Sequence, residues 1–124
     1  MSATVRIKTK ATNLEIIKRM TKLAGWGEVE VVRNQACFSI RPHEQRHVYR
    51  NQIAIDLETG QAAFDGDHRV LHEAAGRIGQ EYEAASVIQQ AEAEGLSWER
   101  TTNEEGFPVV YVDMPDVDME VTYG

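Results

Sequence analysis

The chain has 124 residues, 42% of them hydrophobic, which is enough for one domain with a substantial core. Its net charge of −7 argues against a dedicated nucleic-acid binder, and its single cysteine excludes an internal disulfide. It has no run of about 18 apolar residues and no signal-peptide pattern, so we expect no membrane span, no secretion and a cytoplasmic location.

The charge is spread unevenly along the chain. Residues 1–50 carry ten Lys/Arg and four Asp/Glu, a net charge of +6. Residues 51–91 carry two Lys/Arg and seven Asp/Glu, a net charge of −5. Residues 92–124 carry one Lys/Arg and nine Asp/Glu, a net charge of −8. If the two halves interleave in one sheet, these charges partly neutralise each other. If they do not, the surface is dipolar and could orient a charged partner.

The first half of the chain reads as strands around one short helix. Alternating apolar and polar residues predict strands at 4–10, 28–33, 36–41 and 52–57. Thr12 or Asn13 can cap a helix over 13–24, and Gly25 can end it. Asn34 and Gln35 predict a tight turn, and Gly60 a hairpin loop that leads into a strand at 61–64.

A long helix over residues 67–95 dominates the second half. We expect a turn at 65–67, an Asp cap, and a helix end at Gly95. Its apolar residues form one stripe that then rotates to a second, which indicates either a bend near Gly79 or a second covering surface. The first stripe comprises Leu71, Ala74, Ala75, Ile78, Tyr82 and Ala85, and the second comprises Ala84, Val87, Ile88 and Ala91.

Strands at 96–101 and 107–113 follow this helix, and residues 116–124 form an acidic tail or a short edge strand. The order β-α-β-β-β-β-α-β-β predicts an α+β fold with one domain over residues 1–115. We expect a mostly antiparallel sheet with both helices on one face, in a ferredoxin-like split β-α-β arrangement.

All four histidines fall in pairs with i,i+4 spacing. His43 and His47 belong to an H-E-x-x-H string, and His68 and His72 lie at the start of the long helix. Such pairs can clamp a divalent metal or serve a zinc hydrolase, but Pro42 and a nearby strand leave little room for a helix around the first pair. The alternative is that these histidines are ordinary surface residues, and we expect no cofactor.

Two further groups of residues are candidates for partner binding. Arg41, Arg46 and Arg50 form a basic segment that could contact phosphates or another partner. Val87 and Ile88 lie on the second stripe, which a homo-oligomer would cover if the chain's own sheet does not. Cys37 reads as a small apolar strand residue, and Trp26 and Trp98 as lids of the core. No nucleophile with an oriented base is visible, and we expect no enzyme activity.

Several short segments together resemble a known family. They are the I-K-T-K start followed by a helix and Gly25-Trp26, the Gly60 hairpin ending at Asp65, and Gln80 and Tyr82 followed by Val87 and Gly95. This pattern resembles the Ycf35-like conserved-hypothetical family (DUF1257), which has chloroplast, bacterial and phage members. The H-E-x-x-H string and Asp56 depart from the family pattern, so the resemblance gives the histidine pairs no support.

The family has no established activity to transfer. Its members tend to be encoded beside an AAA-type ATPase, which implies an accessory role and such a protein as a partner. We therefore expect a non-enzymatic binding or adaptor protein that acts through protein contacts. The alternatives are a metal-binding protein or hydrolase that uses the histidine pairs, and an acidic phage-type inhibitor of a nucleic-acid-binding enzyme.

Overall fold

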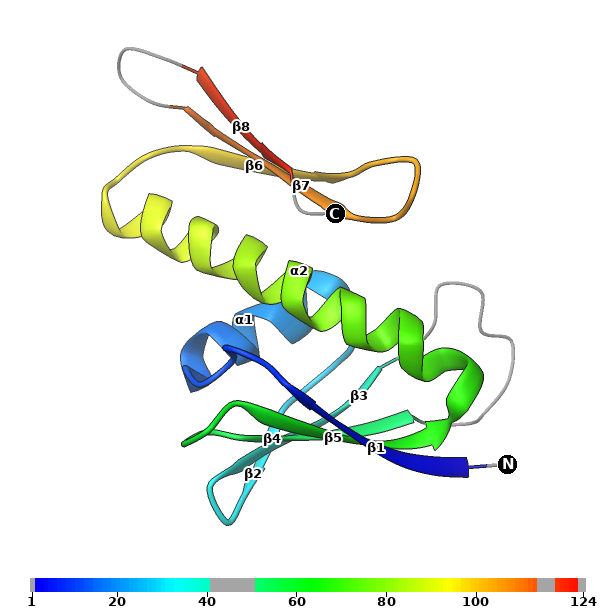
Figure 1. Ribbon diagram of the computed structural model, residues 1–124. Coiled ribbons are helices and arrows are strands. Elements are labelled where there is room, and N and C mark those ends of the chain that lie inside the picture. The colour runs from blue at the N-terminus through cyan, green and yellow to red at the C-terminus, as the bar shows by residue number, and fades with distance from the viewer. Residues whose placement is uncertain (1, 41–50, 114–117, 123–124) are drawn as a thin grey trace.

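A computed structural model of the protein describes the backbone of residues 2–40, 51–113 and 118–122, and the side chains of residues 6, 8–40, 52–64 and 76–113. The described chain forms three layers (Figure 1). A five-stranded sheet lies at the bottom, two helices cross above it, and a three-stranded sheet covers the upper side of the second helix.

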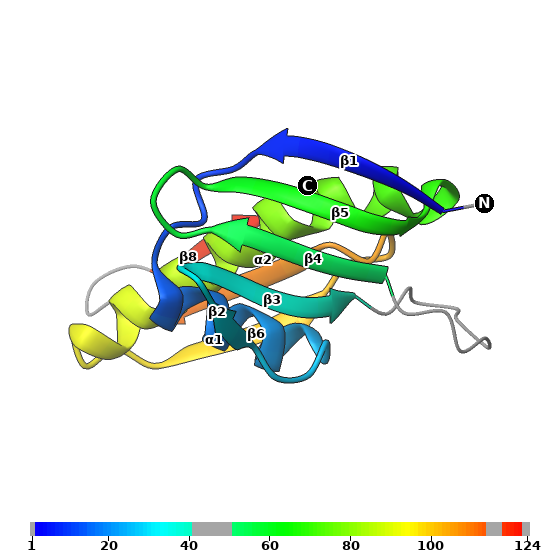
Figure 2. The same ribbon diagram turned by 90° about the horizontal axis from the view of Figure 1, so that it is seen from below.

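The five-stranded sheet is antiparallel throughout and has the strand order β1-β5-β4-β3-β2. Its strands are β1 (Ser2–Lys8), β2 (Glu30–Val32), β3 (Gln35–Ile40), β4 (Asn51–Asp56) and β5 (Gln61–Asp67). Figure 2 shows this sheet from below, with both helices behind it. β3 alternates between buried and more exposed residues, as expected for a strand with one face against a core.

The three-stranded sheet has the order β6-β7-β8 and is also antiparallel. It comprises β6 (Trp98–Thr102), β7 (Pro108–Asp113) and β8 (Asp118–Thr122), so the acidic C-terminal segment contributes an edge strand.

The two helices have recognisable sequence boundaries. In α1 (Leu14–Ala24), the Asn13 side chain accepts a hydrogen bond of 3.2 Å from the Ile16 N–H, and Gly25 ends the helix with φ 75°. In α2 (His68–Ala93), Gly95 has φ 71° and the Leu96 N–H donates to the Ala91 carbonyl. This left-handed glycine satisfies the last carbonyls of the helix in the usual way.

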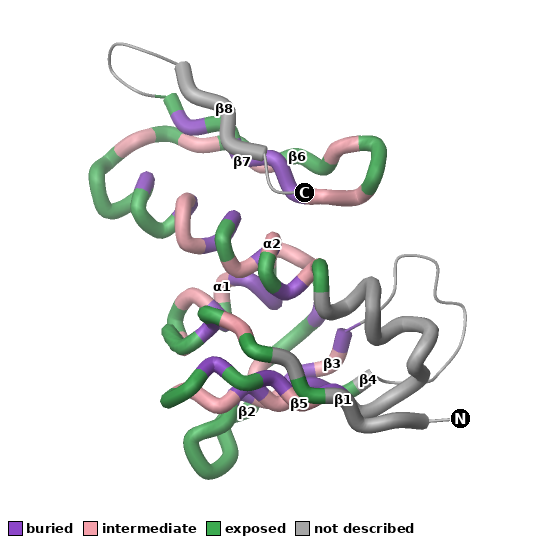
Figure 3. The backbone as a smooth tube through the Cα atoms, viewed as in Figure 1, coloured by how far each residue is buried: buried purple, intermediate pink, exposed green. Residues whose placement is uncertain are grey.

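α2 contributes buried residues to two hydrophobic cores. Figure 3 marks the buried positions along the helix in purple. The first lies between the five-stranded sheet and both helices, and its largest fully buried side chains are Ile17, Met20, Ile40, Ile53, Ile55, Phe64 and Ile78. Trp26 is buried there and stacks on Phe38 with ring centroids 6.0 Å apart, as a core lid should. The second core comprises Ala84, Ile88, Ala91, Val110 and Val112.

These observations confirm the α+β class, the antiparallel pairing and the position of both helices on one face of the first sheet. The connections between strands differ from those of the expected ferredoxin-like arrangement. α1 joins β1 and β2, which run in the same direction at opposite edges with three strands between them. α2 leads out of the first sheet, so the strands divide between two sheets rather than one.

Two local predictions are wrong. Residues 65–67 continue β5 opposite β1 instead of forming a turn, because residues 2–4 of β1 extend the pairing that far. The turn after β2 lies at Arg33 and Asn34, with φ 49° and 64°, one residue earlier than expected. Two positive φ values are typical of the type I′ turn that suits a two-residue hairpin.

The Gly60 hairpin forms as expected. Gly60 has φ 78°, and a Cβ there would lie only 2.2 Å from the Thr9 carbonyl oxygen. The Asp56 side chain accepts hydrogen bonds from the Glu58 and Thr59 N–H groups, which orders the loop. Neither described helix is long and apolar enough to cross a membrane.

Candidate protein-binding surface

The predicted histidine and arginine sites lie largely outside the described structure. His43, His47, Arg41, Arg46 and Arg50 fall in residues 41–50, which are not described. His68 and His72 belong to α2, but their side chains are not described. Among the described side chains, no three His, Cys, Asp or Glu residues lie close enough together to hold a metal ion. The metal hypothesis therefore remains a prediction.

The second stripe of α2 is covered by the chain itself. Ile88 is fully buried in the second core, and Val87 packs against that core. The three-stranded sheet supplies Val110 and Val112 to the same core. A homo-oligomer was expected only if the chain's own sheet left this stripe uncovered. The sheet covers it, so Ile88 is not available to a partner.

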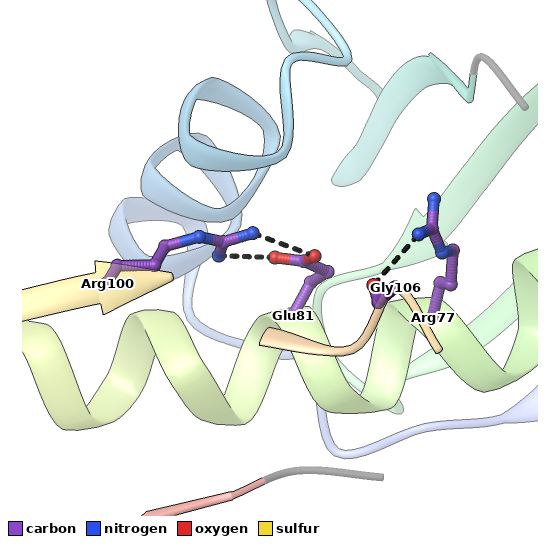
Figure 4. Close-up of polar contacts among 4 residues, drawn as sticks. All are labelled: Arg77, Glu81, Arg100 and Gly106. Atoms are coloured by element: carbon purple, nitrogen blue, oxygen red, sulfur yellow. Dashed lines mark hydrogen bonds and ion pairs between the residues drawn. The ribbon is translucent and has the colours of Figure 1, made fainter. Parts of the chain in front are cut away.

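A buried ion pair attaches the three-stranded sheet to α2 (Figure 4). Arg100 of β6 donates two hydrogen bonds, of 2.6 and 2.9 Å, to the two carboxylate oxygens of Glu81. The Glu81 side chain is 5% exposed and that of Arg100 is 14% exposed. This bidentate geometry orients the guanidinium plane and thereby fixes how β6 lies on the helix.

Two further arginines make contacts between the helices and the three-stranded sheet. Arg77 of α2 donates a hydrogen bond of 2.9 Å to the Gly106 carbonyl in the turn between β6 and β7. Arg19 of α1 pairs with Glu92 near the end of α2. The Arg19 guanidinium carbon also lies 5.9 Å from the ring centroid of Trp98. Trp98 is half-buried at the edge of the second core, so it is a partial lid.

The outer face of the three-stranded sheet, away from α2, is acidic. Val110 and Val112 face the helix, so strand alternation places Tyr111 and Asp113 on the outer side. Tyr111 is 42% exposed, and Glu99 lies opposite it on β6. The register on the other side pairs Tyr111 with Glu120 and Asp113 with Asp118. We call Glu99, Tyr111 and Asp113 the acidic face.

The turn between β6 and β7 extends this acidic character. Glu104 and Glu105 are exposed there. The Asn103 side chain accepts hydrogen bonds from the Glu105 and Phe107 N–H groups, at 3.0 and 2.9 Å. The turn is therefore held in one conformation and presents its carboxylates beside the sheet.

Charge is thus segregated by layer. Residues 98–122, which span the three-stranded sheet, carry seven Asp/Glu and one Lys/Arg, a net charge of −6, whereas residues 1–97 sum to −1. The exposed basic residues Arg6, Lys8, Lys18 and Lys22 lie on β1 and α1. β4 and β5, from the acidic middle segment, interleave with β1 and β3 in the five-stranded sheet, whereas the strands of the C-terminal segment pair only with one another.

Sequence reasoning did not single out the acidic face. The signal was present in the alternation of residues 108–113, where Tyr111 is the one large aromatic residue between inward-facing valines. What was missing was the separate sheet, because alternation along a strand does not reveal which face another layer covers.

Cys37 lies on the outer side of the five-stranded sheet, half-buried rather than in the core. Burial, and secondarily the nearby Glu30 carboxylate, raise the pKa of its thiol. A raised pKa keeps the thiol protonated at neutral pH, so Cys37 is poorly suited to act as a nucleophile.

Comparison of the chain with protein-family models, with curated proteins and with solved structures finds no match. The resemblance to the Ycf35-like family therefore stays a prediction.

Proposed function

We propose that the protein is a non-enzymatic binding protein that recognises a basic surface of a protein partner through its acidic face. The observation that carries this proposal is the segregation of the acidic third of the chain into a separate sheet with Tyr111 exposed at the centre of its outer side. An exposed aromatic residue flanked by the carboxylates of Glu99 and Asp113 is well suited to a basic partner, since tyrosine and arginine are enriched at binding hot spots.

Several features support this role. The acidic sheet is held rigidly to α2 by the Glu81–Arg100 pair and by the Arg77 contact, so its outer face is preorganised for binding. Electrostatic complementarity of this kind raises association rates and selects against acidic partners. An AAA-type ATPase, implied by the family resemblance, and a cytoplasmic setting are part of the proposal.

A charge-reversal pair tests the proposal. The protein, immobilised, would be used to capture partners from a lysate, and the affinity for each captured protein would be measured. We expect Glu99→Lys/Asp113→Lys to weaken binding at least tenfold. The matched control is Glu15→Lys/Glu58→Lys, which makes the same change in net charge at exposed positions on other elements and should bind normally.

Salt provides the second readout. Binding through the acidic face should weaken markedly as the salt concentration rises, because the Debye length shortens from roughly 30 Å at 0.01 M to roughly 10 Å at 0.1 M. Equal loss in both charge-reversal variants would contradict the proposal, as would salt-independent binding.

A second candidate rests on the same acidic face. If the basic surface recognised is the nucleic-acid site of an enzyme, the protein is an inhibitor that mimics nucleic acid. DNA would then compete with the protein for its partner, whereas an adaptor would leave DNA binding intact.

A further inference from the structure

The free edge of the five-stranded sheet at β2 carries exposed aliphatic side chains. Val31 and Val32 are 46% and 44% exposed. Among the described large hydrophobic residues, the only other exposed one is Tyr111. β2 pairs with β3 on one side and is the last strand of the sheet on the other. Two adjacent exposed valines on an edge strand are the arrangement that invites another strand.

The hydrogen-bond pattern shows which backbone groups face the open edge. The Leu57 N–H donates to the Asn34 carbonyl at 3.0 Å, across the pair of Gln35 and Asp56. Gln35 therefore directs its own N–H and C=O groups away from β4 and toward Val32. Since these groups alternate along a strand, Val31 directs its N–H and C=O groups outward. No described backbone group outside the regular strands bonds to them.

The opposite edge of the sheet is protected in the usual way. β1 exposes Arg6 and Lys8, and charged side chains at an edge discourage the addition of a further strand. β2 has no lysine: Glu30 lies within the strand and Glu28 just before it, and the exposed Arg33 follows in the hairpin turn at the other end of the strand. The β2 edge is therefore open to a strand of particular chemistry.

We propose that the β2 edge binds an extended segment of a protein partner, in which aliphatic residues alternate with lysine or arginine. The outward N–H and C=O groups of Val31 provide the strand pairing. The aliphatic residues lie next to Val31, on the side of the sheet that faces the helices, where Val31 pairs with the buried Ala36. The basic residues lie on the other side, next to Glu30, which pairs with Cys37.

This second surface is distinct from the acidic face. β2 and the three-stranded sheet lie at opposite ends of the molecule (Figure 1). Two segments could therefore be bound at once, which is the property that an adaptor requires. The inference does not depend on the acidic face, so the proposal for either surface can be disproved without affecting the other.

The probe is a synthetic peptide in which valine alternates with lysine, and binding is followed by fluorescence anisotropy. All proteins carry Glu99→Lys/Asp113→Lys, so that the acidic face does not contribute to binding. We expect Val31→Pro to weaken binding at least tenfold, because proline removes the outward N–H but no hydrogen bond to β3. Val31→Thr keeps the N–H and a branched side chain, and it should bind within about twofold of the parent.

Two further measurements test the chemistry of the site. Glu30→Lys should weaken binding of the lysine peptide by roughly two- to fivefold. The same change should strengthen binding of a peptide in which valine alternates with glutamate. Hydrogen exchange at the Val31 amide should slow when the lysine peptide is bound. Circular dichroism and thermal unfolding check that each variant is folded.

The proposal is overturned if the lysine peptide does not bind, or if it binds the folded Val31→Pro variant as tightly as its parent. It is also overturned if light scattering shows a dimer that Val31→Pro dissociates, because the edge is then occupied by a second copy of the chain.

Discussion

Glu81 is a carboxylate in a position where apolar residues are the rule, on the part of α2 that the three-stranded sheet covers. Its charge is tolerable there because both oxygens accept hydrogen bonds from Arg100. The pair contributes orientation more than net stability, since removing two charges from water offsets much of their attraction.

Breaking this pair from one side should be severe. We expect Arg100→Met to lower the free energy of unfolding by about 3 kcal/mol, because it leaves the Glu81 carboxylate buried without a partner. Urea titration followed by circular dichroism measures the change. The double variant Glu81→Leu/Arg100→Met removes both charges and should lie within about 1 kcal/mol of the wild type. A double variant as unstable as Arg100→Met would show that the pair is itself strongly stabilising.

At this scale the sequence was informative where chemistry is local. Asn13, Gly25, Gly60 and Gly95 all act as expected, since a cap or a left-handed glycine depends on its immediate neighbours. Glu81 was not singled out, because nothing within a few residues shows that an arginine in a later strand, Arg100, will meet it.

At the scale of elements, α2 accounts for the architecture. Its two apolar stripes were predicted from spacing, and each lies against a different layer: Ile78 and Ala85 belong to the first core, and Ala84 and Ile88 to the second. Spacing reveals how many faces a helix must bury, but strand pairing between distant segments decides what buries them. Two sheets therefore replaced the one expected.

Truncations on the two faces of α2 should have different consequences. Ile88→Ala and Ile78→Ala each remove a fully buried side chain and should each cost about 2–4 kcal/mol. Because Ile88 belongs to the second core, its truncation should speed amide hydrogen exchange in β6 and β7 and leave β3 and β4 protected. Ile78→Ala should speed exchange in the five-stranded sheet.

Comparing Ile88→Ala with Ile78→Ala shows whether the two sheets unfold separately. If Ile88→Ala speeds exchange equally in both sheets, the two cores unfold as a single cooperative unit and the layers are not separately stable.

At the scale of the whole molecule, the distribution of charge follows the layers. The sequence showed the contrast between a basic first half and an acidic last third, and it left open whether they neutralise each other. The structure places the acidic segment in a sheet of its own, with Tyr111 at the centre of the exposed side. Like charges that share one small sheet repel one another, so this layer should be the part of the fold that is most sensitive to ionic conditions.

We expect the free energy of unfolding to rise by roughly 0.5–1 kcal/mol between about 20 and 300 mM NaCl, because salt screens repulsion within the acidic sheet. The half-exposed Arg19–Glu92 pair should weaken with salt, but such a pair contributes little, and the buried Glu81–Arg100 pair is screened less. Urea titrations at both salt concentrations measure the change. Glu99→Lys/Asp113→Lys relieves the repulsion and should flatten the dependence, whereas Glu15→Lys/Glu58→Lys should retain more of it. A wild-type protein that loses stability as salt is added would show that ion pairs outweigh repulsion in this fold.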